Sequence, residues 1–228
     1  MRHNIFHSLL VAAATVGVLT SAAQAATNCR LGEAVEWTAF TGHDNDFRAE
    51  LSMPNANFHG LKRISNFERG DEPCRTESVF GRMPEATRAK AEVQRVTDNC
   101  NGNARDRISV GFDDRLDGAF ITGIKAWTSN QGNATRRRLK GLTAEGRIVD
   151  NQSCGLSEFD FEAWAEPQGI DPDVARSPLT TQHTRNHANR EHSMVQCPDG
   201  WVASGFQLAQ GDRGISGLRL QCREVITR

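Results

Sequence analysis

The chain has 228 residues, and 27 Lys or Arg against 28 Asp or Glu give a formal net charge of −1. This balance argues against nucleic acid or an anionic membrane as the main partner, because both require a strongly basic surface. The chain has no tyrosine, so its 4 tryptophans are the best aromatic faces for stacking on a ligand.

The N-terminus has the pattern of an export signal. Arg2 precedes the apolar run Leu9–Leu19, which is too short to span a bilayer of about 30 Å, and Ala23-Gln24-Ala25 is a small-x-small cleavage pattern. We therefore expect residues 1–25 to be a signal peptide. Residues 26–228 are expected to form a single β domain that is secreted or periplasmic and does not insert into a membrane.

All six cysteines lie after the expected cleavage point, at Cys29, Cys74, Cys100, Cys154, Cys197 and Cys222. An even number in an oxidising compartment favours three disulfides, and fifteen pairings are open. Cys197 and Cys222 bracket one strand–loop–strand unit and are the favoured pair. Sequential pairing would then join Cys29 to Cys74 and Cys100 to Cys154. Metal binding by these cysteines is disfavoured because no C-x-x-C spacing occurs.

The first half of the mature chain gives mixed signals. Residues 34–40, 48–53 and 61–67 are interpreted as strands. Residues 84–96 predict a helix, because Pro84 suits its first turn, Glu85 suits its positive end, and apolar residues repeat along one face.

The second half is rich in predicted strands, at 108–112, 119–127 and 139–149. The last thirty residues repeat the segment 118–147 in altered form, and we place the two repeats at about 108–149 and 194–226. Gly123 and Gly205 lie inside these strands, where glycine usually marks a bulge or a close backbone approach. Residues 159–164 are expected to be a strand or a packed corner. The predicted fold class is all-β, mainly antiparallel, with one short helix.

The last unit begins with Cys197-Pro198-Asp199-Gly200-Trp201 and closes with Ile215-Ser216-Gly217-Leu218-Arg219-Leu220-Gln221-Cys222. This unit resembles a repeat of the vitelline membrane outer layer protein family. The resemblance implies a β-prism, in which three Greek-key sheets surround a pseudo-threefold axis. It also implies a third unit N-terminal to the predicted helix. The apolar residues expected to face inward are Val202, Phe206, Leu208, Leu218 and Leu220.

Four residues are the candidates for binding a ligand. Trp127 and Trp201 offer faces for stacking on a sugar if they are exposed, although a core position is the commoner role. Asp212 and Arg213 lie in the polar loop of the last unit. The basic run Arg136–Arg138 with Lys140 is interpreted as a solvated strand edge, with a polyanionic sugar as the minority alternative.

Metal and catalytic constellations are weaker. His183, His187 and His192 include an i, i+4 pair that can share a helix face and bind zinc, but the segment is polar throughout and a solvated loop is favoured. His43-Asp44-Asp46 could form an acid–base or cation site, and Asp113, Asp114 and Asp117 a cation site, but turn chemistry is favoured for both sets. Glu158, Asp160 and Glu162 would alternate along one strand face if that segment is extended. Such alternation fits either the paired carboxylates of a hydrolase or an exposed strand face.

No catalytic signature stands out, and no cofactor is expected. The sequence predicts a secreted, non-enzymatic binding or structural module, with an extracellular or cell-wall glycan as the partner. A secreted hydrolase that uses carboxylates or the histidine cluster is the second hypothesis. An extracellular protein-binding module, such as an inhibitor or adhesin, is the third.

Overall fold

The computed structural model describes residues 29–44, 47–52, 56–84, 92–98, 100, 104–130 and 136–227. The predicted signal peptide, residues 1–25, lies outside these residues. Within the described part of the chain, no helix is long and apolar enough to cross a membrane.

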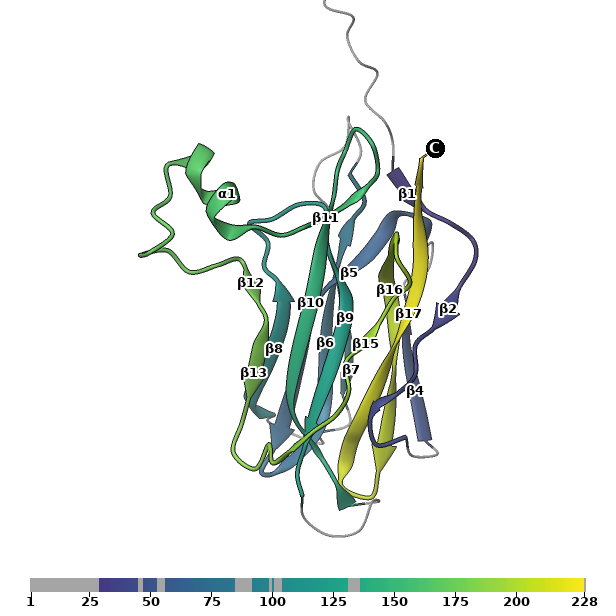
Figure 1. The fold of residues 1–228 in the computed structure, drawn as a ribbon. Helices are drawn as coiled ribbons and strands as arrows, with labels where there is room; N and C mark the ends of the chain where they lie inside the picture. The colour runs from purple at the N-terminus through teal and green to yellow at the C-terminus, as the bar shows by residue number, and fades with distance from the viewer. Residues whose placement is uncertain are drawn as a thin grey trace, which may run out of the picture.

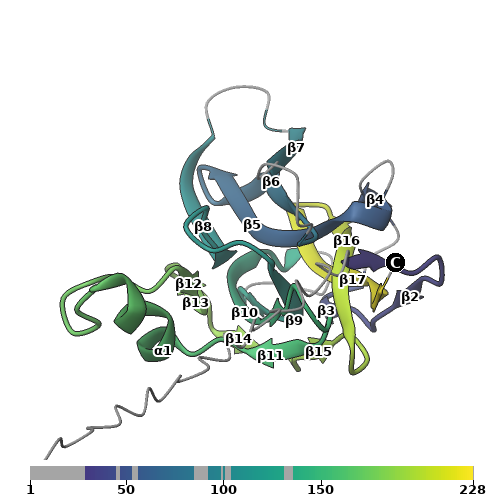
Figure 2. The same cartoon turned by 90° about the horizontal axis from the view of Figure 1, so that it is seen from above.

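The strands form three antiparallel sheets, which Figure 2 shows grouped around a common interior. The first sheet has the order β1 (Cys29–Leu31), β17 (Gly214–Thr227), β16 (Trp201–Gly211), β4 (Phe47–Ser52), with β2 (Glu36–Trp37) and β3 (Thr41–Gly42) on β17. The second has the order β11 (Leu156–Glu158), β10 (Leu139–Val149), β9 (Ala119–Thr128), β14 (Arg190–Glu191), with β13 (Gln182–Thr184) on β10 and β15 (Val195–Gln196) on β9. The third has the order β12 (Leu179–Thr180), β8 (Arg105–Phe112), β5 (His59–Arg69), β6 (Glu72–Arg82), β7 (Glu92–Asp98).

One apolar core joins the three sheets. Each sheet contributes large side chains with almost no exposed surface, among them Leu61, Ile64 and Phe80 from the third, Ile121, Ile124 and Leu142 from the second, and Phe206, Leu218 and Leu220 from the first. The five side chains of the last unit that were expected to face inward are all buried. Three sheets around one interior make a β-prism, so the fold class and the prism architecture predicted from the sequence are confirmed.

A long hairpin forms the centre of each sheet, and the three hairpins share an irregular register. Near its start, the outgoing strand carries one extra residue that has no opposite partner. These residues are Lys62 in β5, Thr122 in β9 and Ser204 in β16. The returning strand carries an extra residue near its own start. These are Cys74 in β6, Lys140 in β10 and Ser216 in β17. The shared pattern relates the hairpins as three copies, and Gly123 and Gly205 each follow a bulge, as predicted.

The β5–β6 hairpin is the third copy, in the N-terminal position that the resemblance implied. Its sequence hid it because polar residues occupy core positions. Counting from the bulges, Asn66 and Thr76 match Ala126 and Leu142 of the second hairpin. Both are buried, and Asn66 Nδ2 donates to Thr76 Oγ1 at 3.2 Å. This hydrogen bond joins the two side chains, whereas Asn66 Oδ1 is buried without a hydrogen-bond partner. Polar residues therefore interrupt the apolar alternation that reveals the other two hairpins in the sequence.

The predicted helix over residues 84–96 is wrong where the structure describes it. Residues 92–98 form strand β7, which pairs with β6, and residues 85–91 lie outside the described part. Strand pairing overrides the local helical pattern here. The α-helix of the described residues is α1 (Phe161–Ala165), which replaces the expected strand or corner. Asp160 caps α1 by accepting from the amides of Glu162 and Ala163.

The disulfides join Cys29 to Cys154, Cys74 to Cys100, and Cys197 to Cys222. The third pair agrees with the favoured pairing, and the sequential assignment of the other four is wrong. Spatial proximity of Cα atoms, and not chain order, decides which cysteines can be bridged. Cys29 begins β1 beside the end of β17, where it packs with Cys154 against Phe120 and Val202.

Lys140 is buried rather than on a solvated edge, which corrects the prediction for the end of the basic run. Only 1% of its surface is exposed. Its ammonium group donates to Glu68 at 3.1 Å and to Asp71 at 3.1 Å, and Arg185 contacts the other oxygen of Glu68 at 3.0 Å. This network ties the second sheet to the third. Lys140 lies on β10 and Arg185 directly after β13 of the second sheet, whereas Glu68 lies on β5 of the third.

Replacing Lys140→Met should therefore destabilise the protein. The buried Glu68 would lose one of its two cations, and we expect the free energy of unfolding to fall by about 3 kcal/mol. Urea denaturation measures the loss. The control is Arg213→Met at an exposed ion pair with Glu72, which should change stability by less than about 0.5 kcal/mol. Equal effects of the two substitutions would contradict the role given to Lys140.

The sheets also approach closely through Gly146. A Cβ atom built at Gly146 would lie 2.2 Å from Cε2 of Phe112, a side chain with no exposed surface. We expect Gly146→Ala to lower the free energy of unfolding by about 1–3 kcal/mol, because a buried ring would have to move. Gly32→Ala is the control, since its nearest contacts of 3.7 Å are ordinary. A Gly146→Ala variant as stable as the control would show that the sheets can separate there.

Candidate functional site

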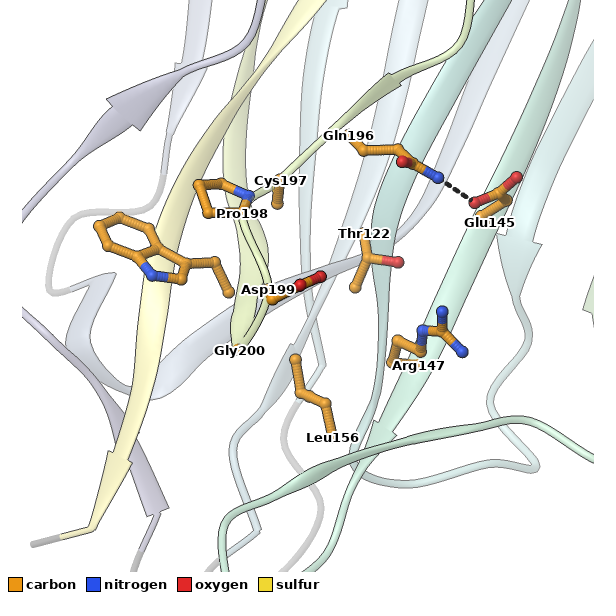
Figure 3. Close-up of a pocket in the computed structure, with 10 residues that line it drawn as sticks. Thr122, Glu145, Arg147, Leu156, Gln196, Cys197, Pro198, Asp199 and Gly200 are labelled. Carbon is orange, nitrogen blue, oxygen red and sulfur yellow. Dashed lines mark hydrogen bonds between the residues drawn. The ribbon is translucent and has the colours of Figure 1, made fainter.

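A polar pocket of about 290 Å³ lies where the outer face of the second sheet meets the loop before β16. Figure 3 shows its lining residues. They are Thr122, Glu145, Arg147, Leu156, Gln196, Cys197, Pro198, Asp199, Gly200 and Trp201. We call this cavity the Trp201 pocket.

The floor of the pocket is built on the bulge of β9. Glu145 pairs with Gly123 and Gly146 pairs with Ile121, so Thr122 is the unpaired residue between them. A bulge commonly re-aims a side chain next to a binding site. The Gln196 side chain approaches the position where Gly123 lacks a Cβ atom, and its Nε2 donates to Glu145 Oε2 at 2.6 Å.

The opposite wall is the loop from Cys197 to Trp201. The disulfide to Cys222 anchors it, and the Cys197 amide donates to the Thr122 carbonyl at 2.8 Å. Gly200 has φ +81°, a conformation that favours glycine. Trp201 lines the pocket, is half-buried and packs against the core. The wall is therefore largely preformed.

Arg147 stands at the rim and is held by an acidic partner. Its Nη1 lies 2.6 Å from Glu158 Oε1, and the two side chains are 39% and 85% exposed. Glu158 belongs to β11, which pairs with β10 directly beside Arg147. The short added strand thus engages the guanidinium at the edge of the pocket.

The junction that is open at Arg147 is closed in the other two hairpins. Arg147 pairs with Phe120, two residues before the bulge of β9. The matching residue is Gly81 in the β5–β6 hairpin and Arg223 in the β16–β17 hairpin. Over Gly81, the buried side chain of Lys62 covers the site and would lie 2.4 Å from an added Cβ atom.

In the β16–β17 hairpin, the side chain of Arg223 itself closes the junction. It is 9% exposed and donates to Asn57 Oδ1 at 2.9 Å and to the Glu33 carbonyl at 3.2 Å. Counted from the bulges, Asn57 matches Asp199 of the Trp201 pocket. The pocket is thus the open member of three equivalent junctions, because Thr122 is too short to cover it and Arg147 is engaged by Glu158.

The four residues predicted to bind a ligand are not brought together. Trp201 lines the pocket, whereas Asp212 and Arg213 form the turn beyond the far end of β16, where Arg213 pairs with Glu72 at 2.8 Å. Trp127 lies near the end of β9 and donates from Nε1 to Thr143 Oγ1 at 3.0 Å.

The polar lining was not predicted from the sequence, because it comes from β9, β10, β15 and the following loop. Thr122, Glu145, Arg147, Gln196 and Asp199 are distant in sequence and form no motif. The signal that pointed there was Gly123, interpreted as the mark of a bulge without a consequence for neighbouring side chains.

The candidate zinc histidines do not share a helix face, because the segment forms short strands and turns. His183 Nδ1 accepts from the Ser109 amide at 3.1 Å, His187 has φ +69°, and His192 Nε2 contacts Thr128 Oγ1 at 2.8 Å. Among the residues that the structure describes, no group of three His, Cys, Asp or Glu is arranged to hold a metal ion.

Three of the candidate acids, Asp113, Glu158 and Asp160, have local partners. Asp113 accepts from the amide and guanidinium of Arg115, as the turn interpretation expected. Glu158 pairs with Arg147 and Asp160 caps α1, so these acids do not alternate along one strand face, which corrects that expectation. Asp46 lies outside the described residues.

His43 and His192 meet in a basic corner between the first and second sheets. Their rings pack edge to face at 5.2 Å, and Arg137 Nη1 donates to His43 Nε2 at 2.8 Å. Burial, followed by the charge of Arg137, lowers the pKa of His43 to about 4. Burial and Arg190 also lower the pKa of His192. The fold therefore favours both rings in the neutral state.

The protein should consequently lose stability in mild acid. Between pH 6.5, the ordinary pKa of these histidines, and about pH 4, the unfolded chain binds more protons than the folded one. The free energy of unfolding should thus fall as the pH falls through this window. Urea denaturation at several pH values measures the slope, which should become flatter in a His43→Gln, His192→Gln double variant. An unchanged slope would contradict the assignment.

Comparisons with known proteins do not identify this chain. No protein-family model matches it, and no curated protein matches its sequence. Similar solved structures include Calystegia sepium agglutinin, at 10% identity and TM-score 0.41 over 86% of this chain and 100% of that one. A mannose-binding lectin from Champedak has 7% identity and TM-score 0.42 over 84% and 99%. The Calsepa lectin in complex with a biantennary N-glycan has 11% identity and TM-score 0.40 over 86% and 100%. These likenesses are too distant to carry an argument, so the architecture rests on the strand pairing of this chain.

Proposed function

We propose that the chain is a non-enzymatic glycan-binding module whose binding site is the Trp201 pocket. The observation that carries the proposal is the opening of one junction where two equivalent junctions are closed by Lys62 and Arg223. The lining combines a tryptophan with carboxylate, amide, hydroxyl and guanidinium groups, which are the groups that stack on a sugar ring and bond to its hydroxyls.

Three related assignments are part of the same proposal. Residues 26–228 act as one domain, exported by the segment 1–25 and working outside the cytoplasm, either secreted or in a periplasm. Three disulfides suit that oxidising setting. Kinship with the vitelline membrane outer layer proteins is supported by the prism and by the unit Cys197–Cys222, and a profile built from homologues of this chain would test it.

The test is to close the pocket as the third sheet closes its own junction. Thr122→Lys places a lysine at the bulge of β9, which matches Lys62 at the bulge of β5. Lys62 covers Gly81 in its own junction. We expect this variant to stay folded and to weaken the binding of the best ligand from a glycan array by at least about tenfold, measured by calorimetry.

Arg213→Ala is the matched control, because Arg213 is exposed at the far turn. It should bind the same glycan as tightly as the parent protein. Loss of binding in the control, with retention in Thr122→Lys, would move the site to the β16–β17 turn. Chromatography of the recovered glycan should show it intact, and cleavage would replace the binding role with that of a hydrolase.

A further inference from the structure

The two closed junctions share a chemical property that extends the proposed function. Each is closed by a cationic side chain of the protein itself, Lys62 in one and Arg223 in the other, with 2% and 9% of their surfaces exposed. The Arg223 guanidinium is held there by the amide oxygen of Asn57 and the carbonyl of Glu33. The two cations reach their junctions from different positions, Lys62 from the bulge of β5 and Arg223 from the returning strand β17, and their counterparts in the open junction are Thr122 and Arg147.

The open junction carries more acid at the matching places. Asp199 stands where Asn57 stands in the junction closed by Arg223, so a carboxylate replaces a neutral amide there, whereas the matching residue in the junction closed by Lys62 is Asp117. Glu145 stands where Gln221 and Val79 stand in the other copies, which adds a second carboxylate. Both acids line the pocket, and the side-chain partner described for Glu145 is the neutral amide of Gln196.

Arg147 does not cancel this acidity, because Glu158 balances its charge at the rim. In Figure 3 the carboxyl groups of Glu145 and Asp199 lie on either side of Thr122, between the strand wall and the loop wall. The lining therefore counts Glu145, Asp199 and one arginine that is already paired. A cation in this space would meet two carboxylates, which attract positive charge, in a pocket that Trp201 also lines.

We infer that the Trp201 pocket receives a positively charged group from its ligand, and that the ligand is a saccharide with free amino groups. The inference rests on the proposed glycan-binding function and specifies its ligand class. The amine occupies the space between Glu145 and Asp199, and the sugar ring lies against Trp201. An acidic sugar would place a negative charge beside Glu145 and Asp199 and is rejected.

Three tetrasaccharides test the inference, because they have the same β-1,4-linked backbone and differ only at C2. The glucosamine tetramer carries an amine, the N-acetylglucosamine tetramer an acetamide and cellotetraose a hydroxyl. Calorimetry at mildly acidic pH, where the amines are protonated, should show the glucosamine tetramer binding about tenfold more tightly than the other two.

Two variants locate the preference. Asp199→Asn, which copies the amide of the closed junction, and Glu145→Gln should each reduce the advantage of the amine-bearing tetramer several-fold. Asp212→Asn, at the exposed far turn, should retain it. Raising the salt concentration should weaken the binding of the glucosamine tetramer alone, because the preference is electrostatic.

The outcomes separate this inference from the proposed function. Equal or tighter binding of the acetylated or neutral tetramer, abolished by Thr122→Lys, would overturn the amine preference and leave a glycan-binding pocket. An amine preference that survives both Asp199→Asn and Glu145→Gln would overturn the placement of the charge. Failure of all three tetramers and of every array glycan to bind would overturn both proposals.

Discussion

The whole architecture depends on the paired bulges of its three central hairpins. A regular flat sheet does not close around an interior, whereas a bulge bends the strand and increases its twist. Each hairpin has one bulge near the start of each strand, so all three sheets curve toward the same core. Because side chains alternate along a strand, a one-residue slip at a bulge would turn the residues beyond it to the other face. The bulges therefore fix both the inner packing and the residues displayed outside.

The same frame explains why a pocket forms in one place. The three junctions have matching backbone positions, and their differences lie in side chains and in one insertion. Lys62 covers the junction of the β5–β6 hairpin and Arg223 fills that of the β16–β17 hairpin, while the β9–β10 hairpin has Thr122 at its bulge. The long segment that follows β10 adds strand β11, whose Glu158 engages Arg147 at the rim. Figure 1 shows this segment, with α1, extending beyond the body of the prism.

Sequence patterns predicted both strands of the β9–β10 and β16–β17 hairpins and the last disulfide, because the apolar residues of these two hairpins follow the inner face. Strand β10 has the predicted bounds, Leu139–Val149. The β5–β6 hairpin buries Asn66 and Thr76 as a bonded pair, so its alternation is hidden. The candidate site was harder to predict from the sequence than the fold. Its lining comes from four separate segments, and the sequence cannot show that a bulge at Thr122 brings them together.

The disulfides differ in the span of chain that they enclose. Cys74–Cys100 and Cys197–Cys222 are separated by 26 and 25 residues, and each lies at one hairpin unit, whereas Cys29–Cys154 spans 125 residues and joins two sheets. The two short bridges need only local structure to bring their sulfurs together. The long bridge requires β1 to be seated on β17 and the β10–β11 turn to be in place. Its oxidation state therefore reports completed assembly of the molecule, and a species with two bridges and free thiols at Cys29 and Cys154 would mark chains that have not yet closed.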